Sequence, residues 1–247
     1  MELGLRGKTA LVTGTGSQKG MGRAIAATLA AEGCDIASAD LDFEGAQKTA
    51  GEVKALGRKA VAYKLDVSNA AEVQSVVQNA VKELGKIDIL VNAAGGTAAA
   101  GPLIQAKEEK WLKDVTVNFI GSLNCAKAVL PGMTERKWGK IVNFSSGVAL
   151  TGMPGSSSYA GAKAGVIAFT KCLALEVGAA NINVNCLAPT MVLTNFGTHA
   201  TMDPKVAEQM AQRMTLKRLT TAQDIANAVL YLVSDMGSSM TGQCLSL

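Results

Sequence analysis

The feature that most constrains the fold is a repeated alternation of short apolar runs with helix-like segments. The apolar runs of strand length lie at 8–13, 35–39, 59–65, 87–91, 140–145, 182–188 and 242–247. Strands and helices that alternate with short connections predict a parallel sheet covered by helices on both faces. The sequence therefore predicts an α/β fold with a doubly wound parallel sheet of about seven strands.

Composition and charge narrow the class of protein. The chain has 247 residues, of which 48% are hydrophobic and 4% aromatic, enough to bury a substantial core in one domain spanning 1–247. The net charge of +4 is spread along the chain, which argues against nucleic-acid binding. No apolar run reaches the roughly 18 residues needed to cross a bilayer, and the first residues lack a signal-peptide pattern. We therefore expect no membrane association and a cytoplasmic location.

The cysteines and the single histidine bear on redox state and on catalysis. The five cysteines are scattered and lack Cys-x-x-Cys spacing, which is typical of small core residues in a reduced compartment. His199 is the only histidine, so the sequence offers no obvious zinc cluster or Ser-His-Asp triad. We expect no metal, and we expect another residue type to transfer protons near neutral pH.

A Gly-rich turn follows the first apolar run and leads into an Ala-rich helix. Strand, Gly-rich turn and helix together form the dinucleotide-binding arrangement of Rossmann-type folds. Glycines let the backbone approach the pyrophosphate, and the helix N-terminus stabilises its negative charge. The predicted cofactor contacts in this turn are Gly14, Ser17, Gly20, Met21 and Gly22.

An acidic residue ends the second predicted strand. Asp40 lies 18 positions after Gly22, where a carboxylate would hydrogen-bond the adenosine ribose. A carboxylate there repels a 2′-phosphate, so Asp40 favours NAD, whereas Lys19 and Arg23 mildly favour NADP. The alternative is that Asp40 only caps a helix or forms a turn.

Further segments follow the third and fourth strands at the same predicted edge of the sheet. Ligands of such folds bind at the carboxyl ends of the strands. The candidates at these two strand ends are Asp66, Val67, Asn92, Ala93, Ala94 and Gly95.

Tyr159 and Lys163 form the candidate pair for acid–base chemistry. They stand four positions apart at the start of a helix predicted over 160–177, so both fall on one helix face. A neighbouring ammonium lowers the pKa of a phenol, which would let Tyr159 exchange a proton near neutral pH. Ser146, at the end of the preceding strand, places a hydroxyl at the same end of the sheet. Taken alone, such a pair is more often a surface contact on a helix.

Two other segments belong to the candidate site. Asn118 lies within a helix predicted over 107–130 and stopped by Pro131, where a buried amide needs hydrogen-bond partners. It is either a satisfied structural residue, or it bends the helix or holds a water near the site. The segment 190–214 is polar and irregular, which is typical of a lid over a binding site.

Together, in this order, these residues resemble the short-chain dehydrogenase/reductase family. The resemblance covers nearly the whole chain and rests on Thr13-Gly14…Gly20-Met21-Gly22, Asp66-Val67, Asn92-Ala93-Ala94-Gly95, Asn118, Ser146, Tyr159…Lys163, Asn185…Pro189 and Thr241-Gly242-Gln243. It implies a single-domain Rossmann fold that assembles into a homotetramer or dimer. A hetero-oligomer with a related subunit stays open.

The resemblance also implies roles for individual residues. Tyr159 would be the proton donor or acceptor, and Lys163 would lower its pKa and bind the nicotinamide ribose. Ser146 would hold the substrate oxygen; it is preferred to Ser145 because it stands thirteen positions before Tyr159, the family's usual spacing. Asn118 would complete a proton relay through water. The cofactor contacts after the sixth strand would be Pro189, Val192 and Thr194, the last two at the carboxamide.

Three features depart from the family pattern. Five residues separate Gly14 from Gly20 where the family usually has three, so we expect a longer pyrophosphate loop and leave the place of Gly16 among the family's glycines open. Thr190 replaces a glycine, which is expected to change the lid hinge. The sequence ends at Leu247, before a Gly-Gly segment often seen in the family, which is expected to weaken a C-terminal subunit contact.

The expected function is NAD-dependent hydride transfer between a nicotinamide and a secondary alcohol or ketone. Small or apolar segments at 96–101 and 150–157 favour a hydroxyacyl-CoA or a cyclic or aromatic hydroxy compound as the substrate. Basic residues near the lid would either meet the phosphates of a CoA thioester or form a solvated face: Lys205, Arg213, Lys217 and Arg218. An NADPH-dependent 3-oxoacyl-carrier-protein reductase is the enzymatic alternative. A non-catalytic nucleotide-binding Rossmann subunit is the alternative of another class.

Overall fold

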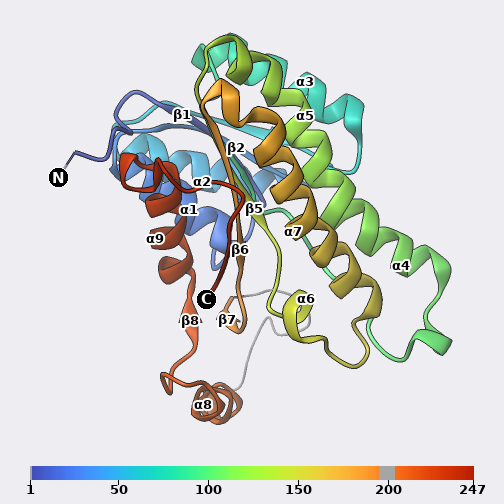
Figure 1. Cartoon of the computed structure of the whole chain (residues 1–247). Helices are drawn as coiled ribbons and strands as arrows, with labels where there is room; N and C mark the ends of the chain where they lie inside the picture. The colour runs from blue at the N-terminus through green and yellow to red at the C-terminus, as the bar shows by residue number, and fades with distance from the viewer. Residues whose placement is uncertain (1, 195–203) are drawn as a thin grey trace.

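The computed structural model, which describes residues 2–194 and 204–247, is built around a seven-stranded parallel sheet (Figure 1). From one edge to the other, the strands are Ala60–Lys64 (β3), Asp35–Asp40 (β2), Thr9–Thr13 (β1), Ile89–Asn92 (β4), Gly139–Phe144 (β5), Ile182–Ala188 (β6) and Cys244–Ser246 (β9). The strand order reverses between β1 and β4, which opens a crevice at their carboxyl ends. The predicted fold class is confirmed.

Helices cover both faces of this sheet (Figure 1). On one face α1 packs against α2 and α9, and on the other α3 packs against α5 and α4 against α7. Their bounds are Met21–Ala31 (α1), Phe43–Ala55 (α2), Ala70–Leu84 (α3), Glu108–Val115 (α4), Gly121–Glu135 (α5), Ser157–Val177 (α7) and Ala222–Val233 (α9). Within the described residues, no helix has the length and apolarity that a membrane span requires.

The core has two halves because successive strand residues point to opposite faces of the sheet. Val12 of β1 packs in a cluster with Ile25 of α1 and Ile225 of α9. Its neighbour Leu11 packs in a second cluster with Val129 of α5. Burial on both faces explains why the strands read as nearly continuous apolar runs.

The helix predicted over 107–130 is divided and longer than predicted. A π-helical turn at Thr116–Ile120 separates α4 from α5, and α5 continues to Glu135. The prediction that Pro131 stops this helix is therefore wrong. A proline removes one helical hydrogen bond, but Met133 beyond it is fully buried in the core, and this packing holds the last turn in place.

The cysteines lie in more varied places than predicted. Cys34, Cys125 and Cys186 are buried, as expected of small core residues. Cys172 is exposed on α7, so the core prediction is wrong for that residue, and Cys244 is half-buried. No disulfide joins any of them.

The segment predicted as a lid, 190–214, is described in part. Val192–Leu193 (β7) pairs with Thr220–Thr221 (β8) in a separate parallel pair, and Pro204–Arg213 forms α8. Residues 195–203, including His199, lie outside the described residues. Together with Val148–Thr151 (α6), these elements gather at the end of the sheet where the strands terminate (Figure 1).

Candidate active site

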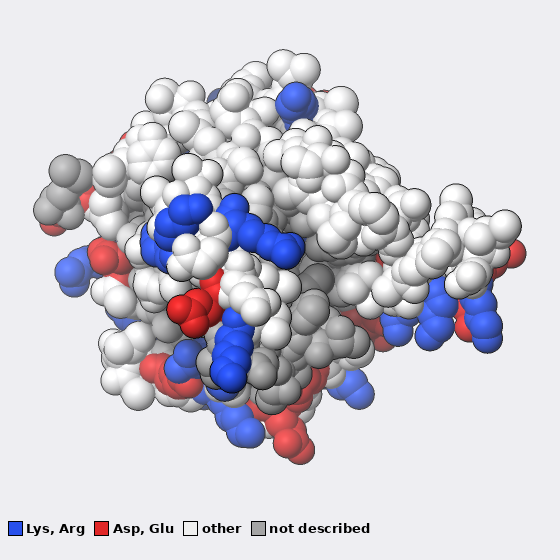
Figure 2. All heavy atoms as spheres, turned by 90° about the horizontal axis from the view of Figure 1, so that it is seen from below, with Lys and Arg blue, Asp and Glu red and all other residues white. Residues whose placement is uncertain are grey.

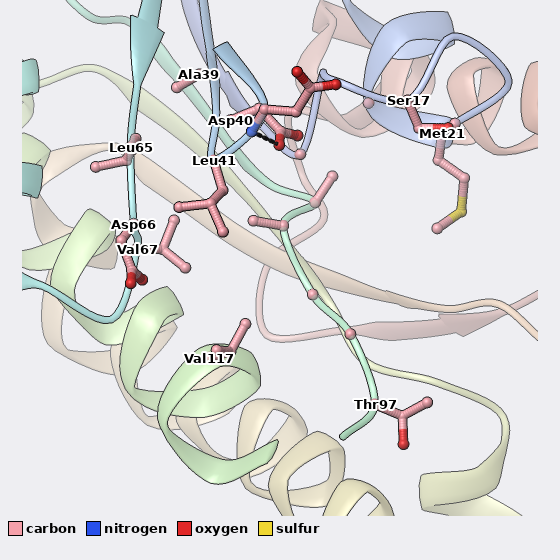
Figure 3. Close-up of a pocket in the computed structure, with 18 of the residues that line it drawn as sticks. Ser17, Met21, Ala39, Asp40, Leu41, Leu65, Asp66, Val67, Thr97 and Val117 are labelled. Atoms are coloured by element: carbon pink, nitrogen blue, oxygen red, sulfur yellow. Dashed lines mark hydrogen bonds between the residues drawn. The ribbon is translucent and has the colours of Figure 1, made fainter. Parts of the chain in front are cut away.

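A cleft of about 880 Å³ opens at the carboxyl ends of the central strands (Figure 3). Figure 3 shows Met21, Asp40 and Asp66 around it, each from a different segment of the chain. Most of the predicted cofactor contacts line this cleft: Gly14, Ser17, Gly20, Met21, Gly22, Asp40, Asp66, Val67, Ala93, Ala94, Gly95 and Thr194. The volume lies in the range typical of small-molecule and cofactor sites.

Two glycines of the turn are required by close backbone contacts. Gly14 has φ +77°, and a Cβ there would lie 2.7 Å from the carbonyl oxygen of Ala93. A Cβ on Gly22 would collide with the carbonyl oxygen of Gly14. Gly20 caps α1 without a side-chain hydrogen bond, so the N–H groups of the first turn have no side-chain cap. The turn and helix end therefore fit a pyrophosphate.

The longer loop folds back onto β2 and α2. The Asp40 carboxylate accepts hydrogen bonds from the backbone N–H of Gly16 at 2.7 Å and of Asp42 at 2.8 Å. Gln18 donates from its amide nitrogen to the carbonyl oxygens of Gly16 and Gly45, at 2.9 and 3.1 Å. Asp40 thus has the turn-forming role that was its alternative, and it also lines the cleft. A carboxylate has about four acceptor positions, so the two roles are compatible.

The far end of the cleft forms an apolar slot. Leu41, Leu65, Val67 and Val117 line it (Figure 3). Asp66, at the end of β3, accepts hydrogen bonds from both the backbone N–H and the hydroxyl of Ser68, at 2.9 and 2.6 Å. A flat aromatic base fits between such apolar walls, so the residues present fit a dinucleotide from its pyrophosphate to its adenine.

Ser146, Tyr159 and Lys163 come together beside this cleft. Tyr159 lies in the first turn of α7 and hydrogen-bonds with the Ser146 hydroxyl. The Lys163 ammonium lies one helical turn along, 5.8 Å from the centre of the Tyr159 ring. It is buried and donates to the carbonyl oxygen of Phe144 at 2.7 Å. Ser145 points elsewhere, because its hydroxyl donates to the backbone of Lys163 at 2.8 Å.

The electrostatics of this group differ from the prediction. Burial is the largest influence on Tyr159 and raises its pKa above the ordinary value, the Ser146 hydrogen bond lowers it, and the Asp114 charge raises it. The prediction that the Tyr159 pKa is lowered is therefore wrong for this structure, in which the pKa is raised and Lys163 is not among the causes. Burial also lowers the pKa of Lys163 to about 8, while Cys186 acts in the opposite sense. Desolvation is the largest influence on the pKa of both residues.

Asn118 lies at the centre of the π-helical turn and is fully buried. Its amide nitrogen donates to the carbonyl oxygens of Gly96 and Asp114, at 2.7 and 2.8 Å, and its oxygen accepts from the Gly96 N–H at 3.2 Å. A Cβ on Gly95 would lie 2.8 Å from the Asn118 amide oxygen and 3.4 Å from the Lys163 nitrogen. The structure thus places Asn118 beside Lys163, in an interruption of a kind that is frequent at functional sites.

Some predicted cofactor contacts lie away from the cleft lining. Asn92 is buried inside the sheet, where its amide nitrogen donates to Asn143 at 2.9 Å and to the Ser122 carbonyl oxygen at 3.3 Å. Its side chain points away from the cleft, because a side chain within a strand of a doubly covered sheet points into a helical layer, and its contact with a cofactor stays a prediction. Pro189 accepts the Gly147 N–H at 2.8 Å, and Val192 packs against the core.

Two of the departures noted in the sequence have structural counterparts. The Thr190 hydroxyl donates to the carbonyl oxygen of Leu247 at 2.7 Å. A Cβ on Gly147 would lie 2.8 Å from the Thr190 methyl group, so Thr190 packs beside the segment that carries Ser146. Five residues between Gly14 and Gly20 form the loop that Asp40 and Gln18 anchor.

Several residues around the cleft were not predicted. They are Ala39, Leu41, Asp42, Leu65, Lys110, Lys113, Asp114 and Val117, whereas Gly96, Thr97 and Ala98 belong to the segment 96–101 that was expected near the substrate. Asp114 had a signal in the sequence, since it stands four positions before Asn118 and therefore on the same helix face. The others depend on how the ends of β2 and β3, α4 and the π-helical turn pack around the cleft.

Comparisons with known proteins agree with this geometry. The sequence model of the enoyl-(acyl carrier protein) reductase family matches residues 14–247. The 3-oxoacyl-[acyl-carrier-protein] reductase FabG of Thermotoga maritima is 36% identical, over 98% of this chain and 97% of its own length. The (2S)-[(R)-hydroxy(phenyl)methyl]succinyl-CoA dehydrogenase subunit BbsD of Thauera aromatica is also 36% identical, over 98% of this chain and 96% of its own.

A solved structure extends the similarity to three dimensions. The NAD+-bound form of a xylitol dehydrogenase superposes with a TM-score of 0.90 at 32% identity, covering 98% of each chain. Family match, relatives and structure all span nearly the whole sequence. The chain belongs to the short-chain dehydrogenase/reductase family and is an oxidoreductase.

Proposed function

We propose that the protein transfers hydride between NAD and a secondary alcohol or ketone. The observation that carries the proposal is the grouping of Ser146, Tyr159 and Lys163 beside a cleft that Asp40 lines. A nicotinamide bound in this cleft would accept or supply the hydride. The protein's own task is to hold the substrate and to move one proton.

Tyr159 is the proposed proton donor or acceptor at the substrate oxygen. The Tyr159 hydroxyl can ionise, and it forms a hydrogen bond with the Ser146 hydroxyl. Ser146 is therefore placed to hold the substrate oxygen with which Tyr159 exchanges a proton. Lys163 is buried, and its ammonium is fixed by the Phe144 carbonyl, so it can keep a constant position beside Tyr159 and a bound ribose. Asn118 secures the neighbouring backbone at Gly96 and is proposed to support the proton path.

Asp40 supports NAD over NADP. Its carboxylate is fixed at the end of β2 by two backbone N–H groups, and it lines the cleft where the adenosine ribose would lie. Arg23, one of the two cations that favoured NADP in the sequence, forms an ion pair with Glu52 at 2.8 Å. That pair reduces the positive charge available to a 2′-phosphate. The solved xylitol dehydrogenase was bound to NAD+, which agrees with this choice.

The proposed substrate is an apolar hydroxy compound or its CoA thioester. Leu150 and Met153, in the segment after Ser146, are 53% and 52% exposed at this end of the molecule. Figure 2 views this end and shows Lys and Arg side chains gathered around α8 and the turn after it, with acidic groups among them. The exposed cations there include Lys205, Arg213, Lys217 and Arg218, of which Arg218 is ion-paired with Asp224 at 2.7 Å. They support a phosphate-bearing substrate, as in the relative that acts on a succinyl-CoA.

An NADPH-dependent 3-oxoacyl-carrier-protein reductase is the second candidate. It is favoured by the relatives that carry this name at 36–37% identity. A non-catalytic nucleotide-binding subunit is the candidate of a different class. A buried ammonium beside a phenol argues against it, because burying the charge costs free energy that nucleotide binding alone does not require.

Initial rates at 340 nm test the proposal. NAD+ and NADP+ are compared with a panel of secondary alcohols and hydroxyacyl-CoA esters. We expect NAD+ to give a kcat/KM at least about tenfold higher, which corresponds to 1.4 kcal/mol. Tyr159→Phe should lose about 10²–10⁴-fold in rate, whereas the control Tyr63→Phe should retain it. A preference for NADP+ would favour the carrier-protein reductase, and no turnover of any alcohol or ketone would favour the non-catalytic subunit.

A further inference from the structure

A buried carboxylate lies next to the proposed proton-transfer residue and has no part in the mechanism above. Asp114, near the end of α4, is 1% exposed. One carboxylate oxygen accepts the backbone N–H of Ala98 at 2.6 Å, and the other accepts the hydroxyl of Ser158 at 2.6 Å. Ser158 immediately precedes Tyr159.

The Asp114 carboxylate is held by hydrogen bonds rather than by an ion pair. No Lys or Arg forms an ion pair with it among residues 2–194 and 204–247. A buried carboxylate without a counter-charge is costly, and a neutral side chain of the same shape could make similar contacts. The negative charge therefore calls for an explanation beyond packing.

The contacts of Asp114 join three parts of the site. Its carbonyl oxygen accepts the Asn118 amide at 2.8 Å, and Asn118 in turn holds both backbone groups of Gly96. The loop after β4 is thus fixed at Gly96 by Asn118 and at Ala98 by Asp114. The other carboxylate oxygen ties this unit to the first turn of α7 through Ser158.

We propose that Asp114 is a positioning residue that ties the first turn of α7, and with it Tyr159, to the loop at 96–98, and that its negative charge helps the site to retain the Tyr159 proton. The proposal rests on the role of Tyr159 in the proposed function. It extends that function by assigning a residue that sets the pH range in which the site works. The Asp114 charge acts on Tyr159 in the raising direction, which agrees with the geometry.

The charged surroundings of Tyr159 are simple in the described part of the chain. Lys163 lies on α7 itself with the Cys186 thiol near it, and α4 brings Asp114 together with Lys110 and Lys113, which line the cleft. The loop 96–106, α6, the π-helical turn and residues 189–194 contain no ionisable side chain. A neutral residue at 114 therefore removes the one negative charge from this group.

The test measures the pH dependence of kcat/KM for alcohol oxidation in Asp114→Asn. Asparagine can still accept the Ala98 N–H with its oxygen and donate to the Ser158 hydroxyl with its nitrogen, so both contacts can persist. We expect the midpoint of the acidic limb to move by about one pH unit to lower pH, the usual spread of tyrosine pKa values in folded proteins. A second neutral variant, Asp114→Ser, should move it in the same direction.

Two variants separate charge from structure. Ser158→Ala keeps the Asp114 charge but breaks its tie to α7, so kcat should fall severalfold while the limb stays in place. Asp88→Asn is the control. Asp88 lies just before β4, at the opposite end of that strand from the cleft, and is also a buried carboxylate that accepts a backbone N–H, from Thr9 at 3.0 Å, although it is ion-paired with Lys86 at 3.1 Å. This substitution should leave the limb unchanged.

Each outcome decides between explanations. A limb that stays in place, or moves to higher pH, in the neutral Asp114 variants overturns the proposal. So does failure of both neutral variants to fold, because Asp114 would then be needed for structure alone. Tyr159→Phe is measured alongside: if it keeps a wild-type rate and pH profile, the proposed function itself is wrong. If Tyr159→Phe is inactive and the acidic limb of the neutral Asp114 variants stays where it is in the wild type, only the proposed role of Asp114 is wrong.

Discussion

Lys163 should make the protein less stable at neutral pH, and Lys163→Met tests this. The ammonium is 4% exposed, and burial lowers its pKa from 10.5 to about 8. At 1.36 kcal/mol per unit, this shift corresponds to about 3 kcal/mol. Methionine removes that cost but leaves the Phe144 carbonyl oxygen without its donor, a loss of about 1 kcal/mol. We expect the variant to be more stable by about 2 kcal/mol at pH 7.

The sign of the pH dependence follows from proton binding. Below pH 8 the lysine is charged in both the folded and the unfolded state, so the wild type bears the full cost of burial. Between about pH 8 and 10.5 the unfolded state binds more protons, so the free energy of unfolding of the wild type rises with pH. The advantage of Lys163→Met should therefore shrink across this window. Above it, the wild type should be more stable by about 1 kcal/mol, through the Phe144 hydrogen bond.

Urea unfolding followed by circular dichroism at pH 7, 9 and 10.5 measures this difference. The protein is kept free of cofactor and at one concentration, because ligands and self-association both shift apparent stability. Lys171→Met is the matched control, since Lys171 lies exposed on the same helix. Its unfolding free energy should follow the wild type at each pH.

A specific result would refute this reasoning. If Lys163→Met is no more stable than the wild type at pH 7, burial of the ammonium is compensated by contacts that the structure does not show. If its advantage persists unchanged at pH 10.5, the effect comes from methionine packing rather than from the charge.

Two other substitutions test the backbone around the site and the stability of α9. Gly95→Ala should lower turnover by at least about tenfold, because the new Cβ would lie 2.8 Å from the Asn118 amide oxygen. The control Gly51→Ala, in α2 with open space around it, should retain full activity in the 340 nm assay, and equal rates for the two variants would contradict the close contact. Thr221→Ala removes the capping box with Asp224 at the start of α9 and should lower the free energy of unfolding by about 1 kcal/mol in thermal melts. An unchanged melting temperature would mean that the cap is not needed.

The local patterns of the sequence were sufficient for the fold class and for most of the cleft. Apolar runs of strand length and the Gly-rich turn each depend on neighbours in the chain, and the structure has both. The order of strands placed Asp40, Asp66 and Gly95 at one edge of the sheet. Their roles toward a cofactor stay predictions.

Other features could not be predicted because they depend on distant contacts. The continuation of α5 past Pro131 depends on the burial of Met133 against both strands and helices. The direction of the Tyr159 pKa depends on how deeply the phenol is buried, which spacing along a helix does not reveal. Asn92 was expected in the cleft. Its hydrogen bond to Asn143, which joins strand β4 to strand β5, could not be predicted from the sequence.

By itself, the sequence indicated which family the chain resembles, where the seven strands of the sheet lie, and which helix face carries Tyr159 and Lys163. These properties follow from residue spacing within single elements, where the backbone geometry is regular. Only the tertiary structure decided that the longer Gly-rich loop is anchored to Asp40 and that the Lys163 side chain is buried away from solvent. It also decided that Asp114 reaches Ser158 from 44 positions away. Burial and charge proximity arise when separate elements pack, and so they were settled by the fold as a whole.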